Sequence, residues 1–455
     1  MELTCFKAYD IRGVLGETLD AAIAERIGRA FADTAGPGPV VVGYDARPTS
    51  PALAAALAQG LIWRGRDVID IGLCGTEEVY FATAFLEAGG GIMVTASHNP
   101  IEYNGMKIVG PGSRPLDPAT ELAALKARAE ADQYDPAPSA GQVRAKSLRA
   151  AFADHVAGFA DASAIGPMRI LVNAGNGTAG AAFDTVAERL IARGAELDII
   201  RMDHAPDPSF PNGIPNPMLS ENRVRTAERV RGEGADLAIA WDGDFDRCFF
   251  YDETGELIPG ELVVALLADA TLRREAGAAI VYDPRVTGAV EATIAAGGGR
   301  PTRSRVGHAF VKGAMRGAEA AYGGEMSAHH YYRDFFYCGS GMIPWVQMLG
   351  ILTRRGGRVS ELVADLRQQF PSSGEINFTV RETKATMERV VAALEAEGPE
   401  VDRLDGVSLD FGTWRMNIRP SNTEPLLRLN LETKGDAALL DSKMTEIRAL
   451  IETHA

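Results

Sequence analysis

Val41-Val42-Gly43-Tyr44-Asp45-Ala46-Arg47-Pro48 is an apolar run that ends in Asp-x-Arg, and an Ala-rich segment with helical spacing follows it at residues 51–64. The pattern is repeated further along the chain in Ile280-Val281-Tyr282-Asp283-Pro284-Arg285. The middle segment has a similar run without the arginine, Ile170-Leu171-Val172-Asn173-Ala174-Gly175. Short apolar runs that lead into amphipathic segments are typical of βαβ units with mainly parallel sheets. The sequence therefore predicts three copies of one α/β unit.

The same alternation predicts further elements of these units. We expect strands at 40–44, 68–71, 92–95, 169–173, 237–241 and 279–282, and helices at 51–64, 77–87 and up to residue 193. Near the C-terminus the pattern changes to strands at 376–381, 408–418 and 426–432, flanked by two Ala/Glu-rich helices. This change predicts a smaller α+β domain at the end of the chain.

Proline, glycine and small polar residues cluster at three predicted linkers, 132–142, 252–260 and 368–374. We accordingly expect an α/β fold with three related mixed/parallel-sheet domains and a smaller C-terminal α+β domain. The predicted boundaries are 1–150, 151–254, 255–369 and 370–455.

The chain of 455 residues carries 46 basic and 61 acidic side chains, which gives a net charge of −15. An acidic balance argues against a nucleic-acid-binding surface, although a local basic cluster can still bind a small anion. The four cysteines lack disulfide or metal-binding spacing, and no signal peptide or apolar stretch of about 20 residues is found. We therefore expect a cytoplasmic protein that binds neither nucleic acid nor membranes.

The sharpest local feature is Asp242-Gly243-Asp244-Phe245-Asp246-Arg247, directly after the apolar run 237–241. Alternate residues of an extended segment share a face, so the three carboxylates can converge on one hard cation such as Mg²⁺. A solvated acidic turn is the simpler alternative, but three such carboxylates beside a buried strand are costly without a cation. An EF-hand is rejected, because Arg247 stands where that loop needs glycine.

A second feature is Thr95-Ala96-Ser97-His98-Asn99-Pro100, which follows a predicted buried strand. A serine on a tight turn at the carboxyl end of a strand is a candidate nucleophile, and an ordinary turn is the alternative. Lys107, in Asn104-Gly105-Met106-Lys107, places a cation within reach of this loop.

Two further motifs could bind a substrate. In Gly323-Gly324-Glu325-Met326-Ser327-Ala328-His329-His330, Glu325 and Ser327 alternate on one face and could hold adjacent sugar hydroxyls, whereas the two histidines lack a third ligand for zinc. In Arg419-Pro420-Ser421-Asn422-Thr423-Glu424-Pro425, an arginine followed by hydroxyls and an amide suits a phosphate, and a Pro-bounded loop is the alternative. Lys7, Tyr9 and Arg12 form a basic N-terminal cluster.

Together these segments resemble the α-D-phosphohexomutase family, and within it the bacterial phosphomannomutase branch. The resemblance covers essentially the whole chain, because Phe6-Lys7-Ala8-Tyr9-Asp10-Ile11-Arg12-Gly13, the Ser97 loop, the Asp242 loop, the Glu325 loop and the Arg419 loop occur in the family order. The family has four domains around a central active-site cleft, and the resemblance implies this arrangement here.

The resemblance also implies roles for individual residues. Ser97 would carry the phosphoryl group, and one of its phosphoserine oxygens would bind Mg²⁺ together with Asp242, Asp244 and Asp246. The implied catalytic residues are Ser97, His98, Lys107, Arg12, Arg247 and His308, with Lys107 and His308 as candidate general bases. The implied substrate-binding residues are Tyr9, Glu325, Ser327, His329, Arg419, Ser421, Asn422 and Thr423.

The implied reaction is the reversible conversion of mannose 6-phosphate into mannose 1-phosphate through a hexose 1,6-bisphosphate, which also serves as activator. Use of glucose phosphates, alone or beside mannose phosphates, is the first alternative, since C2 epimers can share contacts at C3 and C4. A Mg²⁺-dependent sugar phosphatase and a non-catalytic sugar-phosphate sensor are further alternatives. The partner is expected to be a phosphorylated hexose, and the protein a monomer or a weak homo-oligomer.

Overall fold

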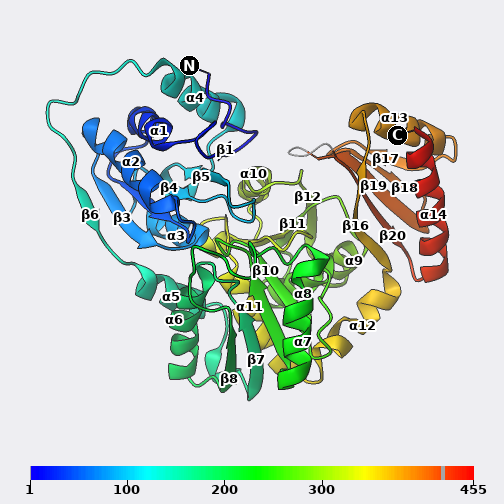
Figure 1. The fold of residues 1–455 in the computed structure, drawn as a ribbon. Helices are drawn as coiled ribbons and strands as arrows, with labels where there is room; N and C mark the ends of the chain where they lie inside the picture. Colours follow the sequence, from blue (N-terminus) through cyan, green and yellow to red (C-terminus); the bar gives the residue numbers. More distant parts are fainter. Residues whose placement is uncertain (1, 422–425, 455) are drawn as a thin grey trace. The chain divides into compact units, whose positions relative to one another are not determined.

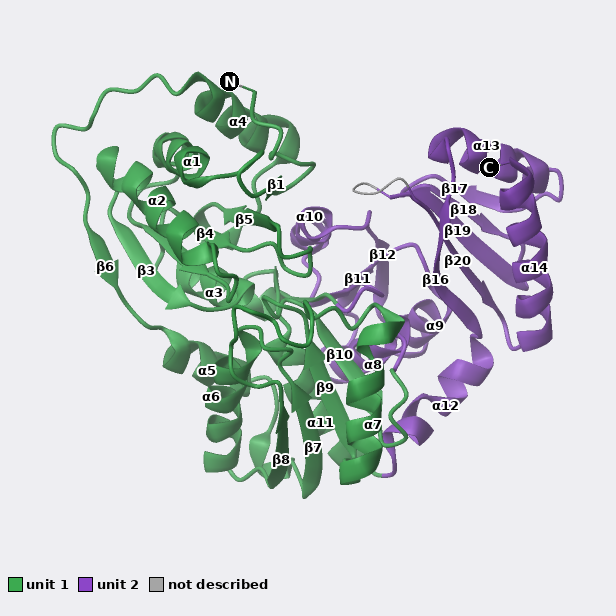
Figure 2. Ribbon diagram, in the orientation of Figure 1, with its two compact units in different colours: residues 1–257, 329–356 green, residues 258–328, 357–455 purple. Residues whose placement is uncertain are grey.

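The computed structural model describes residues 2–421 and 426–454. The chain divides into two compact units, distinguished by colour in Figure 2. Unit 1 comprises residues 1–257 and 329–356, and unit 2 comprises residues 258–328 and 357–455.

The first sheet of unit 1 has six strands in the order β1-β5-β4-β2-β3-β6 (Figure 1). Its strands are β1 (Ile11–Val14), β2 (Val40–Tyr44), β3 (Val68–Leu73), β4 (Gly90–Val94), β5 (Tyr103–Val109) and β6 (Val143–Ala145). β2 is parallel to β3 and β4, and β3 to β6, whereas β5 is antiparallel to β1 and β4. The sheet is therefore mixed.

Successive residues of β2 are buried on opposite faces of this sheet. Val40 and Val42 join the large apolar core under three helices, whereas Val41 packs with Val79 in a smaller core under a fourth helix. The helices are α1 (Ala21–Thr34), α2 (Ser50–Trp63) and α4 (Ala123–Ala131) on the first face and α3 (Thr76–Phe85) on the second. Burial on both faces explains why the strand reads as a continuous apolar run.

The second sheet of unit 1 has the order β10-β9-β7-β8, with β10 antiparallel to β9 and the other pairs parallel. Its strands are β7 (Met168–Asn173), β8 (Leu197–Met202), β9 (Leu237–Trp241) and β10 (Cys248–Asp252). The remaining elements of unit 1 are α5 (Arg149–Ala157), α6 (Ala179–Ala192), α7 (Val224–Glu233), β14 (His330–Tyr332), β15 (Cys338–Gly339) and α11 (Met342–Arg355).

Unit 2 combines a parallel and an antiparallel arrangement. In the first, β11 (Ala279–Tyr282) lies between β12 (Arg300–Arg303) and β13 (Tyr322–Gly324), with helices α8 (Gly260–Arg274), α9 (Gly288–Ala296) and α10 (His308–Ala318). The second is an antiparallel sheet in the order β16-β20-β19-β18-β17. Its elements are β16 (Ser372–Thr379), β17 (Glu400–Asp402), β18 (Val407–Asp410), β19 (Trp414–Pro420), β20 (Leu426–Thr433), α13 (Thr383–Glu395) and α14 (Ala437–His454), preceded by α12 (Val359–Gln369).

The predicted repeat has a common local geometry at the ends of β2, β7 and β11. In each case the side-chain Oδ1 of the first polar residue accepts a hydrogen bond from the backbone N–H two residues later. The pairs are Asp45 with Arg47 at 3.0 Å, Asn173 with Gly175 at 2.9 Å, and Asp283 with Arg285 at 2.9 Å. Each of the three strands is also flanked by two parallel neighbours. The three α/β units thus share both topology and turn.

The predicted fold class is confirmed, with three α/β units built on mixed or parallel sheets and a C-terminal α+β unit. Two details were predicted wrongly. The segment 408–418 is not one strand but the hairpin β18–β19, which turns at Gly412 with φ +85°. The supposed linker 368–374 already contains the start of β16 at Ser372. The four domain boundaries remain predictions.

None of the helices in the described residues combines the length and apolar character that a membrane crossing needs.

Candidate active site

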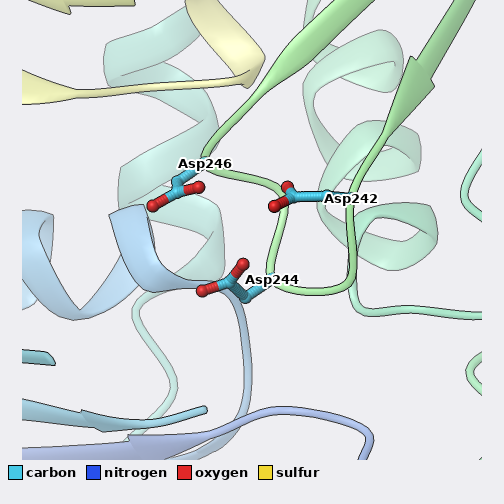
Figure 3. Close-up of side chains that lie close together, drawn as sticks. All are labelled: Asp242, Asp244 and Asp246. Atoms are coloured by element: carbon cyan, nitrogen blue, oxygen red, sulfur yellow. The ribbon is translucent and has the colours of Figure 1, made fainter. Parts of the chain in front are cut away.

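The three aspartates of the acidic motif lie on the turn between β9 and β10 (Figure 3). One oxygen from each carboxylate lies within 4.8 Å of the others, and all three side chains are buried. The segment is not extended as expected, because Phe245 adopts φ +45° and folds the chain into a compact turn. Convergence therefore comes from the turn rather than from strand alternation.

The two oxygens of each carboxylate have different surroundings. Asp242 Oδ2 accepts from Ser97 Oγ at 2.7 Å, and Lys107 Nζ donates to the Oδ2 atoms of Asp244 and Asp246 at 2.7 and 2.5 Å. In contrast, all three Oδ1 atoms are buried without a hydrogen-bond partner in the described residues. Three orphaned carboxylate oxygens in one place fit a hard divalent cation such as Mg²⁺.

The charges of the turn are only partly balanced by protein cations. Burial, together with Asp244 and Asp246, raises the pKa of Asp242 to about 7. Burial alone would raise the pKa of Asp246. Lys107, His329 and Arg247 outweigh this effect and hold the pKa of Asp246 well below its usual range. A bound cation would relieve the mutual repulsion of these carboxylates.

The raised pKa of Asp242 predicts how the stability of metal-free protein depends on pH. The folded chain keeps this proton to about pH 7, whereas the unfolded chain releases it near the ordinary value of 3.8, so rising pH between these values favours unfolding. We expect the melting temperature of wild type, measured in chelator and relative to Asp242→Asn, to fall by at least about 3 °C from pH 4 to 7. Asp246 is present in both proteins, so the comparison removes the part of its opposite shift that does not depend on Asp242. A difference that does not change with pH would contradict this prediction.

Ser97 stands in a strained turn after β4. Its φ of +50° lies in the left-handed region, which costs a residue other than glycine about 1 kcal/mol. The Ser97 N–H donates to Thr95 Oγ1 at 2.8 Å, and its Oγ lies 3.1 Å from His98 Nδ1. Desolvation and the cations Arg247, Arg12 and Lys107 hold the pKa of His98 well below its usual range, so the imidazole is neutral. The Ser97 hydroxyl thus donates to Asp242 Oδ2 and has the His98 imidazole as a second hydrogen-bond neighbour.

Two residues that hold this cluster were not singled out from the sequence. The buried Arg47 guanidinium donates to the carbonyls of Ser97 at 3.0 Å and Tyr103 at 3.0 Å, and also to the carbonyl of Asn99. Thr76 Oγ1 donates to Asp244 Oδ2 at 2.5 Å. The repeated Asp-x-Arg pattern could have identified Arg47 as a residue at the carboxyl end of a strand, whereas Thr76 has no such signal.

The other predicted residues of unit 1 lie around the same turn or near it. Arg12 donates to the Thr95 carbonyl at 3.1 Å and pairs with Asp10 at 3.1 Å. Arg247 Nε lies 3.8 Å from Asp242 Oδ2 and 3.3 Å from His329 Nε2, and that His329 nitrogen lies 3.5 Å from Asp246 Oδ1. Tyr9 is half-buried in the N-terminal segment.

A second cluster gathers in unit 2. Glu325 Oε1 accepts from the N–H of Gly307, the residue before His308 at the start of α10. Arg285 donates to Ser327 Oγ at 3.2 Å, and its Nη2 lies 4.0 Å from Glu325 Oε1. Glu325 and Ser327, the predicted sugar-binding residues, are therefore linked through Arg285, the arginine of the second Asp-x-Arg motif.

The predicted phosphate-binding Arg419 belongs to the same cluster. Its Nη2 donates to Glu375 Oε2 at 2.8 Å, and Arg428 and Arg285 also pair with that carboxylate. The Ser421 N–H donates to the Leu426 carbonyl at 2.8 Å. Asn422 and Thr423 lie outside the described residues. Glu375 and Arg428 were not identified from the sequence, because single charges in strands give no signal.

The structure thus brings the candidate residues together in two groups. In the described residues, the three aspartates are the only group of three or more His, Cys, Asp or Glu side chains close enough to share a metal ion. The group in unit 1 contains Ser97, His98, Lys107, Arg12, Arg247, His329, Asp242, Asp244 and Asp246, and the group in unit 2 contains His308, Glu325, Ser327, Arg419 and Ser421.

Four family models match the chain in succession. They describe the phosphoglucomutase/phosphomannomutase α/β/α domains I, II and III at residues 4–135, 150–255 and 259–370, and the C-terminal domain at residues 375–450. These matches cover most of the chain.

Relatives match over nearly their full length. The phosphomannomutase of Salmonella montevideo is 50% identical over 453 residues, covering 99% of both chains, and the phosphohexose mutases protein of Xanthomonas campestris pv. campestris (strain B100) is 49% identical over 451 residues, covering 99% of this chain and 100% of its own. A crystal structure of a phosphoglucomutase/phosphomannomutase family protein from Burkholderia thailandensis is 30% identical, with a TM-score of 0.87, and covers 100% of this chain and 98% of that one.

Proposed function

Because the chain belongs to the phosphoglucomutase/phosphomannomutase family, we propose that it interconverts mannose 6-phosphate and mannose 1-phosphate through a hexose 1,6-bisphosphate. The observation that carries this proposal is the Ser97 hydroxyl, 2.7 Å from Asp242 on the turn with three orphaned carboxylate oxygens. A nucleophile beside a hard-cation site is what phosphoryl transfer requires.

In the first half-reaction the phosphoryl group on Ser97 Oγ passes to a sugar hydroxyl. The sugar oxygen bonds to phosphorus, the bond from phosphorus to Ser97 Oγ breaks, the sugar proton leaves to a base, and the departing Ser97 Oγ takes up a proton from solvent. Of the two candidate bases, His308 is favoured, because Asp244 and Asp246 outweigh burial and raise the pKa of Lys107. Lys107 then acts as a fixed positive charge rather than as a base.

In the second half-reaction Ser97 Oγ attacks the other phosphate of the bisphosphate, and the sugar oxygen leaves and takes back a proton from the base. The Ser97 proton moves toward Asp242 Oδ2, its acceptor 2.7 Å away. Asp242, Asp244 and Asp246 with a phosphoserine oxygen would hold Mg²⁺, which supplies positive charge to the phosphoryl oxygens. Arg247, Arg12 and Lys107 add further charge stabilisation.

Residues of unit 2 complete the proposal. Glu325 and Ser327 would bind the 3- and 4-hydroxyls of the sugar, with Tyr9 and His329 as further contacts, and the non-reacting phosphate would lie on Arg419, Ser421, Asn422 and Thr423. The proposal requires both groups of residues to act on one sugar phosphate. We further propose a cytoplasmic protein, monomeric or weakly oligomeric, with domains at 1–150, 151–254, 255–369 and 370–455.

A product assay tests this function. Mannose 1-phosphate and glucose 1-phosphate are supplied in parallel with Mg²⁺ and a trace of hexose 1,6-bisphosphate, and both the 6-phosphates and free phosphate are measured. We expect conversion to the 6-phosphates, with kcat/KM values that favour mannose by no more than about tenfold, because the epimers differ only at C2. Stoichiometric phosphate release without isomerisation would instead identify a phosphatase, and a large glucose preference would reassign the substrate.

A further inference from the structure

Three guanidinium groups of unit 2 surround the carboxylate of Glu375, which projects from β16. Arg419 Nη2 lies 2.8 Å and Arg285 Nη1 3.5 Å from Glu375 Oε2, and Arg428 Nη1 lies 3.3 Å from Oε1. The arginines come from β19, β20 and the loop after β11. The two oxygens of one carboxylate thus hold three guanidinium groups from three separate segments.

Arg419 has an unused donor in this cluster. Arg285 is paired elsewhere as well, with Asp283 at 2.8 Å and with Glu325 at 4.0 Å. The Arg419 side chain is only 4% exposed, and its Nε has no hydrogen-bond partner in the described residues. Burial and the nearby Arg285 lower the pKa of Arg419, which reflects the crowding of cations. A buried guanidinium with an unused donor favours the binding of an anion.

Glu375 already uses the donor that such an anion needs. A phosphate bound in bidentate fashion takes two N–H groups of a guanidinium, and the Nη2 of Arg419 is bonded to Glu375. The two carboxylate oxygens therefore stand where two oxygens of a phosphate would compete for the same arginines.

We propose that Glu375 is an internal counter-ion that holds Arg419, Arg285 and Arg428 when no phosphate is bound and weakens the binding of phosphate by competing for them. The role of this competition in turnover rests on the proposed function. During turnover the bisphosphate must release one of its phosphates from this cluster and then bind through the other. This release is faster when the Glu375 carboxylate replaces the phosphate as the hydrogen-bond acceptor of the arginines. Tight binding without such a competitor would stabilise the intermediate and lower kcat.

A purely structural role for Glu375 predicts the opposite result. If the carboxylate only orients Arg419 to receive phosphate, its loss leaves the guanidinium disordered and binding becomes weaker. The sign of the change in affinity therefore separates a competitor from a support.

The test measures binding of inorganic phosphate to the full chain by calorimetry, without Mg²⁺. We expect Glu375→Gln to lower the Kd at least about fivefold, because a charge-assisted competitor is lost. The matched control is Glu388→Gln, which removes the same charge from a glutamate of the same C-terminal region whose side chain is 55% exposed, and it should leave the Kd unchanged. Arg419→Ala combined with Glu375→Gln should abolish the gain, which places the binding at this cluster.

An unchanged or higher Kd in Glu375→Gln would overturn the proposal. Glu375→Ala provides a second variant with the same expected gain, and a failure of both variants to fold would also overturn it, by making the carboxylate a structural support. Turnover then tests the purpose separately, since kcat on hexose phosphates should fall in Glu375→Gln. If Glu375→Gln binds phosphate more tightly but the wild-type protein interconverts no hexose phosphate, the proposed function is contradicted and the counter-ion role of Glu375 is still supported.

Discussion

Replacement of Ser97 by alanine is expected to reduce the interconversion of hexose phosphates by at least about 1,000-fold. Alanine removes the oxygen that would carry the phosphoryl group and leaves Asp242 Oδ2 without its 2.7 Å donor. The backbone at φ +50° still accommodates alanine as it does serine. Steady-state kcat/KM on mannose 1-phosphate, together with the loss of a phosphorylated species in the intact mass, checks both the rate and the site of attachment.

The chain offers a matched control in Ser113→Ala. Ser113 is also buried, also lies in the left-handed region with φ +56°, and also uses its hydroxyl in a hydrogen bond, to the Tyr80 carbonyl. Its hydroxyl donates to a backbone carbonyl of α3 rather than to the acidic turn, so we expect activity within about twofold of wild type. Equal losses in both variants would trace the effect to the fold, and full activity in Ser97→Ala would show that another group carries the phosphoryl.

The second large effect is expected from Asp244→Asn. The amide keeps the size of the side chain and can still accept from Thr76 at the 2.5 Å contact, but it removes one charge from the proposed cation site. We expect the affinity for Mg²⁺ to fall at least about 100-fold, and kcat/KM at low Mg²⁺ by a similar factor. Calorimetric titration with Mg²⁺ measures the first quantity, and activity measured across Mg²⁺ concentrations the second. Partial recovery at high Mg²⁺ is the signature of weakened metal binding.

Asp252→Asn separates this effect from a general loss of buried charge. Asp252 is a buried aspartate at the end of β10, and its Oδ1 accepts from Thr254 and Glu256 in a local turn. An asparagine Oδ1 can accept the same bonds, so we expect Mg²⁺ affinity to remain unchanged. Normal Mg²⁺ affinity in Asp244→Asn would contradict a cation site on these carboxylates.

Much of the fold was predictable because it follows from burial. β2, β9 and β11 are covered on both faces and therefore read as uninterrupted apolar runs, with observed bounds equal to the expected ones for all three. The hairpin β18–β19 was merged into one strand, since its turn is marked only by Asp410 and Gly412 within an otherwise strand-like sequence. Hydrophobic periodicity does not record a reversal of direction.

The candidate site was predictable where several functional side chains lie close together in the sequence. Asp242, Asp244 and Asp246 lie within five residues and could be recognised together, although the turn that gathers them depends on Phe245 rather than on strand alternation. Glu375 has no local pattern of this kind, because its partners Arg419 and Arg285 come from distant segments of the chain. Contacts of that sort are set by packing and become visible only in the structure.

The common turn after β2, β7 and β11 explains how one duplicated module can acquire different tasks. The turn is closed through a backbone N–H, so the closing hydrogen bond itself does not depend on the side chain two positions after the polar residue. Arg47 at this position ties down the Ser97 loop, and Arg285 reaches Ser327. Gly175 does neither, because a Cβ there would lie 2.3 Å from Pro215. Because the closing hydrogen bond does not use the side chain at this position, the turn can be kept in each copy of the unit. The residue at that position can then differ between copies and support a loop, contact a ligand-binding residue or only fill space.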